Sequence, residues 1–138
     1  MKNRAVKVIV RFLITISINF LLIMGVFILV KGMYLMGVPK IDDVQKVTIS
    51  YPELTNETKE ISDEKQIELA VKLTGFLKYS LFEKADDKGS PMITITYFLS
   101  NGQSISVSAN RDTVWWKGKV HAVKDKDMFI NLAEGIFF

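Results

Sequence analysis

The most apolar part of the chain is an uninterrupted run near its N-terminus. Phe12 to Val30 form nineteen consecutive positions without a charge. As a helix rising 1.5 Å per residue, this run is about 28 Å long and crosses a hydrocarbon core of roughly 30 Å. A buried helix of a soluble protein rarely stays apolar over such a length. The pattern therefore predicts a transmembrane helix over residues 12–31.

The charges around this run predict its orientation. Lys2, Arg4, Lys7 and Arg11 precede it without any acid, and only Lys31 follows closely. Basic residues stay on the cytoplasmic side, so we expect residues 1–11 in the cytoplasm and the chain from residue 32 onward outside. A cleaved signal peptide is the alternative, but its apolar region is usually shorter and residues 31–40 offer no clear small-x-small cleavage site. A retained signal anchor of a single-pass cell-membrane protein is the expectation.

Alternating positions begin after a juxtamembrane linker at residues 32–43. The stretch Val44–Tyr51 predicts a strand with Val47, Ile49 and Tyr51 inward, and a polar loop follows at residues 52–59. Residues 92–100 and 103–109 predict two more strands. Asn101-Gly102 between them is typical of a type I′ hairpin turn. Two further strands are expected around Gly118.

Helical spacing appears in two places. Residues 61–83 predict a long helix capped by Ser62 or Asp63, with Glu68 and Lys72 as an i,i+4 pair. Its apolar arc requires a covering sheet. The arc consists of Ile67, Leu69, Ala70, Val71, Leu73, Leu77 and Leu81.

A short C-terminal helix is expected after Asp125 or Asp127, either of which would cap it. We expect it to dock on the domain through Met128, Phe129, Leu132, Ile136 and Phe137. The fold class is therefore α+β. An N-terminal transmembrane helix precedes a small β-α-β-β-β-β-α domain at residues 44–138, with a mostly antiparallel sheet.

Net charge excludes one class of function. The whole chain carries +3, but residues 1–39 hold five basic residues and no acid, which leaves thirteen basic residues against fifteen acids in residues 40–138. This domain has no basic excess to neutralise phosphates, so we do not expect nucleic-acid binding. The chain has no cysteine, so neither a disulfide nor a lipidated cysteine anchor is expected.

Rare residue types gather in the stretch DTVWWKGKVHAVK, residues 112–124. It holds Trp115, Trp116 and the single histidine, His121, with Lys117 and Lys119 beside the glycine of the turn. Adjacent residues of a strand point to opposite faces, so only one tryptophan enters the main core. The other is covered by the C-terminal helix, contacts a partner or lies near the membrane interface. The number of residues in the turn decides which tryptophan shares a face with the histidine.

Catalytic and metal-binding chemistry lacks its usual residues. The chain has no nucleophile-elbow motif with which His121 could act as a catalytic base. A zinc ion would have to be bound by His121 and carboxylates alone. The acid pairs Asp42-Asp43, Asp86-Asp87 and Asp125-x-Asp127 do not continue as EF-hand loops. We therefore expect no enzyme and no cofactor.

Two polar residues interrupt the transmembrane run on one face. Thr15 and Asn19 lie four positions apart. A buried asparagine amide is unfavourable against lipid, but it forms a hydrogen bond when it faces another helix. Either a helix contact or a tolerated polar residue explains it.

The pattern VQKVTISY, KEISDEKQIELAVKL, MITITYFLSNGQSISVS and VWWKGKVHAVKD, within residues 44–138, resembles small single-pass membrane-anchored outer domains of Firmicutes. The resemblance implies a Gram-positive membrane protein with an outer α+β domain, and it carries over no functional residues.

Two functions remain. One is a non-enzymatic extracytoplasmic binding module for sensing, regulation or immunity, with a protein or peptide partner at residues 115–121. The alternative is an accessory subunit of a larger membrane complex, assembled through its transmembrane helix.

Overall fold

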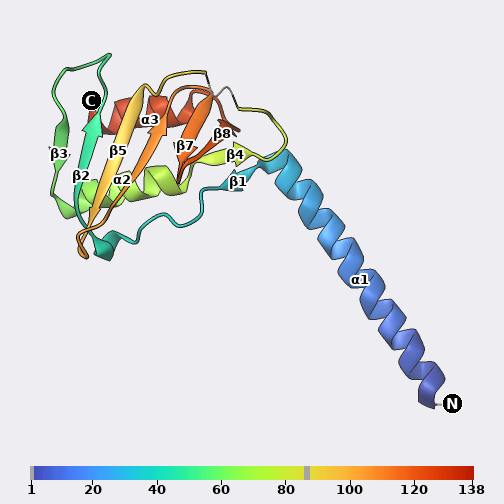
Figure 1. Ribbon diagram of the computed structural model, residues 1–138. Helices are drawn as coiled ribbons and strands as arrows, with labels where there is room; N and C mark the ends of the chain where they lie inside the picture. Colours follow the sequence, from blue (N-terminus) through green and yellow to red (C-terminus); the bar gives the residue numbers. More distant parts are fainter. Residues whose placement is uncertain (1, 86–87) are drawn as a thin grey trace.

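The computed structural model describes residues 2–85 and 88–138, and it confirms the α+β class (Figure 1). A long N-terminal helix leads into a sheet that two further helices accompany. The helices are α1 (Lys2–Lys31), α2 (Glu64–Gly75) and α3 (Met128–Phe137), and a 3-10 turn, η1, covers Ile41–Asp43. The strands are β1 (Met33–Tyr34), β2 (Val44–Ser50), β3 (Lys59–Ile61), β4 (Lys78–Ser80), β5 (Ile93–Leu99), β6 (Ser104–Ala109), β7 (Thr113–Trp116) and β8 (Lys119–Val123).

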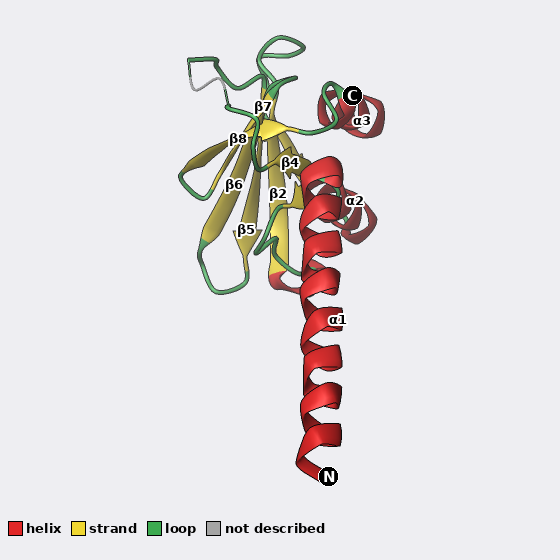
Figure 2. Ribbon diagram, turned by 90° about the vertical axis from the view of Figure 1, so that its right-hand side faces the viewer, coloured by secondary structure: helices red, strands yellow, loops and turns green. Residues whose placement is uncertain are grey.

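All eight strands belong to one antiparallel sheet. Its order is β1-β4-β8-β7-β6-β5-β2-β3. Helices α2 and α3 lie on the same face of this sheet, and the opposite face carries no helix (Figure 2). Consecutive strands β5 to β8 are joined by tight turns, as the alternating pattern predicts. The expected linker, residues 32–43, contributes β1 and so joins the sheet edge.

Helix α1 is long and apolar enough to cross a membrane by length and composition, and its side chains are exposed. It begins at Lys2, so the basic N-terminal segment continues the same helix. At the other end, Gly32 donates its N–H to the carbonyl of Ile28 with a φ of +79°. The chain then enters β1, which pairs with β4. The apolar helix is therefore joined directly to one edge of the sheet (Figure 1).

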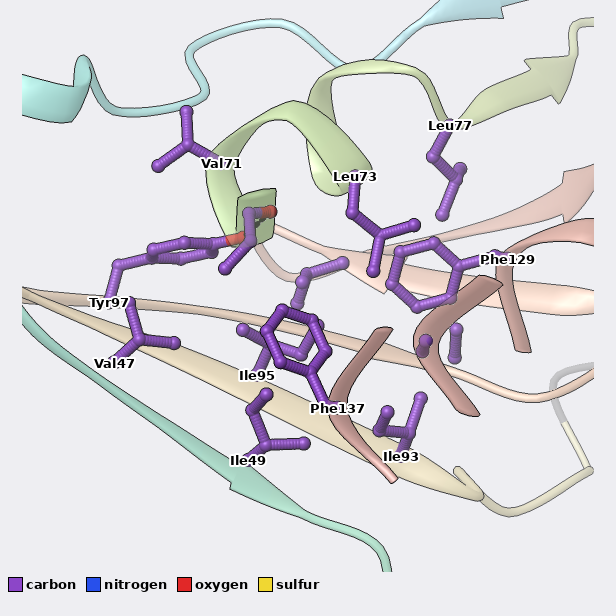
Figure 3. Close-up of a cluster of buried hydrophobic side chains, with 14 of the residues drawn as sticks. Val47, Ile49, Val71, Leu73, Leu77, Ile93, Ile95, Tyr97, Phe129 and Phe137 are labelled. Atoms are coloured by element: carbon purple, nitrogen blue, oxygen red, sulfur yellow. Dashed lines mark hydrogen bonds between the residues drawn. The ribbon is translucent and has the colours of Figure 1, made fainter. Parts of the chain in front are cut away.

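The core lies between the sheet and the two helices of the domain. Val47, Ile49 and Tyr51 are buried as the alternation predicts. Phe129 and Phe137 of α3 cover the same face as Leu73 of α2 (Figure 3). Apolar burial of this kind is the main stabilising contribution to such a fold.

A buried tyrosine joins the sheet to α2. The hydroxyl of Tyr97 donates to the carbonyl of Ala70 at 2.6 Å and also bonds the hydroxyl of Thr74. Burial raises the pKa of Tyr97 above its ordinary value. The hydroxyl thus stays neutral and satisfied inside an apolar core.

The prediction of a helix over residues 61–83 is wrong after Gly75. Asp63 caps α2 by accepting the N–H of Gln66 at 3.3 Å, and Glu68 pairs with Lys72 at 2.8 Å, both as expected. The helix then ends because glycine is a poor helix former. Residues 78–80 become β4, whose backbone pairs with β1 and β8. Of the predicted apolar arc, Leu69 and Leu81 are exposed, and the other members are buried.

The hairpin after β5 forms as predicted, but its turn is not type I′. Gly102 has a φ of +86°, whereas Asn101 is not among the described residues with positive φ. Leu99 donates its N–H to the carbonyl of Gln103 at 2.8 Å, which closes a three-residue loop. A single glycine at the left-handed position is typical of such loops.

Two further expectations need correction. The polar loop after β2 ends in a strand, β3, which extends the sheet by pairing with β2. On α3, Leu132 and Ile136 are exposed, and Ile130 and Ala133 are buried with the two phenylalanines. Asp127 occupies the N-cap position with a φ of +70° and makes no side-chain cap. Its carboxylate instead lies 3.4 Å from Arg111.

Candidate functional site

The turn between β7 and β8 has two residues, which settles the register around Gly118. Lys117 and Gly118 have φ values of +49° and +75°. Positive φ at both central positions defines a type I′ turn. Trp116 then pairs with Lys119, and Val114 pairs with His121. The histidine therefore shares a face of the sheet with Trp116.

The two tryptophans lie on opposite faces, as strand alternation requires. Trp116 is 5% exposed and lies on the core face with Val107 and Val114. Trp115 is partly buried on the other face, where Ser108 and Val120 are its neighbours across the strands. Helix α3 packs on the core face, where Phe129 and Phe137 belong to the same buried cluster as Trp116, so it does not cover Trp115.

A hollow of about 290 Å³ opens where the β7–β8 turn meets the segment after α1. Strands β1, β4 and β8 are neighbours in the sheet, which brings three distant parts of the chain together. The indole N–H of Trp116 donates to the carbonyl of Met36 at 2.9 Å and fixes the turn against this segment. We call it the hairpin hollow, and its lining is Met36, Gly37, Tyr79, Trp116, Lys117, Lys119 and His121.

The hairpin hollow is electropositive. Lys117 and Lys119 are exposed, and the ammonium of Lys117 lies beside Gly37, 5.5 Å from the centre of the Trp116 ring. A side chain at position 37 would meet that ammonium, so the close approach depends on glycine there. The lining contains no carboxylate. The charged side chains that an anionic group would meet in the hollow are therefore all cationic.

His121 forms one wall through a ring contact. Its imidazole lies 4.2 Å from the Tyr79 ring, centre to centre, with the planes 32° apart. Burial lowers the pKa of His121, and the neighbouring charge of Lys119 lowers it further. The neutral imidazole has one donor and one acceptor nitrogen, so it is suited to hydrogen bonding at neutral pH.

Nothing in this geometry assembles a catalytic set. The hollow brings together no nucleophilic hydroxyl, histidine and acid. Over residues 2–85 and 88–138, no group of three or more His, Asp or Glu could hold a metal ion. Asp86-Asp87 lies outside the described residues. The arrangement supports binding through charge, hydrogen bonds and aromatic surface.

The polar residues of α1 form a separate feature. Thr15 donates its hydroxyl to the carbonyl of Arg11 at 2.9 Å, and Ser17 does the same to Leu13. Both hydroxyls are thereby satisfied within their own helix. The amide of Asn19 has no such bond in the described chain, and it is exposed on the helix surface.

Sequence reasoning named four of the seven residues that line the hollow. Trp116, Lys117, Lys119 and His121 come together as a group, whereas Trp115 is directed to the other face. Met36, Gly37 and Tyr79 were missed because they come from the expected linker and from the segment predicted as helix. A short apolar stretch with a glycine directly after the apolar run was the available signal.

No family model matches the chain, and neither the curated proteins nor the solved structures include a significant match.

Proposed function

We propose that this chain is a membrane-anchored, non-enzymatic binding module whose ligand occupies the hairpin hollow. The observation that carries the proposal is the composition of the hollow. Trp116, Tyr79 and His121 supply aromatic surface, while Lys117 and Lys119 supply charge without an opposing acid. Binding sites commonly combine an apolar lining with a few convergent polar groups. The ligand is expected to carry a negative charge.

The place of the hollow in the chain supports an anchored role. Its lining begins at Met36, only five residues after α1 ends at Lys31. With α1 retained as the anchor and the N-terminus in the cytoplasm, the domain lies outside the cytoplasm with the hollow close to the bilayer. A sensor, a regulator or an immunity protein would gain from holding its binding site there.

Site-specific photo-cross-linking tests this proposal in native membranes. Benzoylphenylalanine replaces Met36, whose side chain is 69% exposed beside the hollow, or Leu54, which is 53% exposed in the loop between β2 and β3. We expect an adduct from position 36 only. Combining Lys117→Asn with Lys119→Gln should reduce its yield, because both changes remove a cation from the hollow. An equal yield with and without these changes would contradict the proposal.

Asn19 favours a second candidate, an accessory subunit assembled through α1. Among the described residues its amide has no hydrogen-bond partner, while Thr15 and Ser17 bond their own helix. In lipid, an unpaired amide is stabilised by contact with another helix. Asn19→Leu should then shift the protein to a smaller species in a native gel, whereas Thr15→Val should not. Unchanged migration of the Asn19→Leu variant would argue against this candidate.

A further inference from the structure

Three segments without a single acid meet at one edge of the sheet. They are residues 31–37, 78–80 and 117–124, and together we call them the basic edge. Strand pairing brings them together, because β1 pairs with β4 and β4 pairs with β8. Figure 1 shows β1, β4 and β8 beside the C-terminal end of α1. The edge therefore lies where the apolar helix leaves the domain.

Charge is strongly segregated toward this edge. It contains five lysines and the only histidine, whereas the rest of residues 38–138 holds nine Lys or Arg against fifteen Asp or Glu. The domain is close to neutral as a whole because a cationic edge is balanced by a remainder with a net charge of −6. The lysines of the edge are Lys31, Lys78, Lys117, Lys119 and Lys124.

Within the described residues, no ion pair uses a lysine of the basic edge, whereas ion pairs do form at Lys46, Lys72, Arg111 and Lys126. Three of the five lysines rest on neighbouring groups without losing their charge. Lys78 lies 5.0 Å from the centre of the Tyr34 ring, Lys117 lies 5.5 Å from that of Trp116, and Lys124 packs against Gly32.

The uncharged residues of the edge suit a membrane surface. Tyr34 is 51% exposed and Met36 is 69% exposed, directly after the apolar helix. Tyrosine and tryptophan are enriched at the level of lipid headgroups. The six Cα–Cα steps from Lys31 to Gly37 span at most about 22 Å when extended, so the hollow stays close to the end of the helix.

We propose that the basic edge binds the headgroups of anionic phospholipids in the leaflet where α1 ends, with a phosphodiester seated in the hairpin hollow by Lys117, Lys119 and His121. This inference rests on the proposed function, because it names the ligand of the same hollow. Lysines beside an anionic leaflet are attracted to it, and the attraction falls off within a Debye length. The acidic remainder of the domain is repelled by the same surface. Attraction of the basic edge and repulsion of the remainder together favour one orientation of the domain, with the basic edge toward the bilayer.

An acidic peptide fits the observations less well than a lipid. The cations extend from the hollow to Lys124, which packs against Gly32, and to Lys31 at the end of the apolar helix itself. A soluble partner covering that whole edge would have to displace the bilayer, whereas headgroups already lie there. The spread of charge along the helix end therefore favours the lipid surface.

A single fluorescent probe tests the inference in the full-length protein. The chain has no cysteine, so Met36→Cys carries one environment-sensitive NBD label beside the hollow. The protein is placed in nanodiscs of phosphatidylcholine, or of an equal mixture with phosphatidylglycerol. We expect a blue shift and a rise in emission in the anionic discs, which high NaCl reverses. Lys117→Asn with Lys119→Gln should abolish the shift.

The matched control removes two charges from elsewhere. Lys46→Gln with Lys65→Gln changes β2 and α2, outside the basic edge, and leaves the same net charge as the test variant. This control should retain the shift. Equal emission in the two kinds of disc, or equal loss in both double variants, would overturn the lipid inference.

Two results separate this inference from the proposed function. Inorganic phosphate that produces the same shift in neutral discs would show a free-anion site and overturn the lipid inference alone. A protein adduct at position 36 that depends on Lys117 and Lys119, with no response to lipid charge, would also overturn it while supporting the binding module. A lipid adduct with the same dependence would support both.

Discussion

The indole N–H of Trp116 donates to the backbone carbonyl of Met36 at 2.9 Å. This bond joins the turn between β7 and β8 to the segment that follows the apolar helix, eighty positions earlier in the chain. It places the cationic side chains of the turn against that segment. The same bond thus shapes the hairpin hollow close to the C-terminal end of α1.

Trp116→Phe should loosen this connection. The substitution keeps an aromatic ring in the core but removes the donor, so we expect a loss of about 1–2 kcal/mol in the free energy of unfolding. Hydrogen exchange of residues 33–38 should accelerate when it is followed by mass spectrometry in detergent. Trp115→Phe is the control, because that ring lies on the other face and should leave the exchange of this segment unchanged.

Lys117→Asn should stabilise the β7–β8 hairpin. Lysine adopts the left-handed region reluctantly, whereas asparagine is enriched there and Asn-Gly is the favoured type I′ pair. The gain, about 0.5–1 kcal/mol, is partly offset by losing the contact with the Trp116 ring. Thermal unfolding monitored by circular dichroism measures the change.

Gly118→Ala should destabilise the same turn, whereas Lys117→Asn should stabilise it. Gly118 has a φ of +75°, and a Cβ added there would meet no atom within 4 Å. Any destabilisation, which we expect to be about 1 kcal/mol, therefore reports backbone conformation alone.

A Lys117→Asn variant that unfolds at a clearly lower temperature than the parent would contradict the assignment of a strained lysine.

The sequence pattern was sufficient to predict an element where the periodicity of its apolar residues agrees with their observed burial. Val47 and Ile49 of β2 and Tyr51 directly after it alternate in sequence and are buried, and the apolar run forms α1. In both cases the environment of each residue follows from its own element, so no knowledge of distant contacts is needed. These elements could be predicted from the sequence.

Residues 76–83 show why other parts of the fold could not be predicted from the sequence. Leu77 and Leu81 continue the helical spacing of α2, yet the chain turns at Gly75 and enters β4. The backbone of Lys78–Ser80 is satisfied by β1 on one side and β8 on the other. Tertiary pairing of this kind overrides local propensity, and periodicity carries no information about it.

The composition of the candidate site also depends on how distant segments pair. His121 shares a face with Trp116 only because Lys117 accepts a φ of +49° and closes a two-residue turn. Tyr79 and Met36 then complete the hollow from segments that lie far away in sequence. The sequence identified the chemical groups of the hairpin, whereas strand pairing determined which distant residues meet them.

His121 should report the charge of the hollow through its titration. Burial and Lys119 lower its pKa below 6.5, so the unfolded chain binds the proton more readily than the folded one. The free energy of unfolding should therefore fall as the pH decreases from 6.5 toward the folded pKa, and this contribution is fully present above 6.5. Because the chain has one histidine, a single imidazole signal in NMR follows the titration.

Lys119→Gln should raise the pKa of His121, since it removes the neighbouring positive charge. Lys65→Gln on α2 is the control and should leave the titration unchanged. A midpoint above 6.5 in the parent protein would contradict the burial of the imidazole against Tyr79.

Two fully buried threonines should respond oppositely to the same substitution. Thr74 and Thr113 are both 0% exposed. The hydroxyl of Thr74 bonds that of Tyr97, whereas in the described residues the hydroxyl of Thr113 is buried without a hydrogen-bond partner. Thr113→Val replaces it with a methyl group of similar shape and should stabilise the protein by about 1 kcal/mol. Thr74→Val removes a partner of Tyr97 and should cost about 1–2 kcal/mol. Urea unfolding of each variant in detergent gives both values, and a destabilised Thr113→Val variant would show that its hydroxyl has a partner in solution.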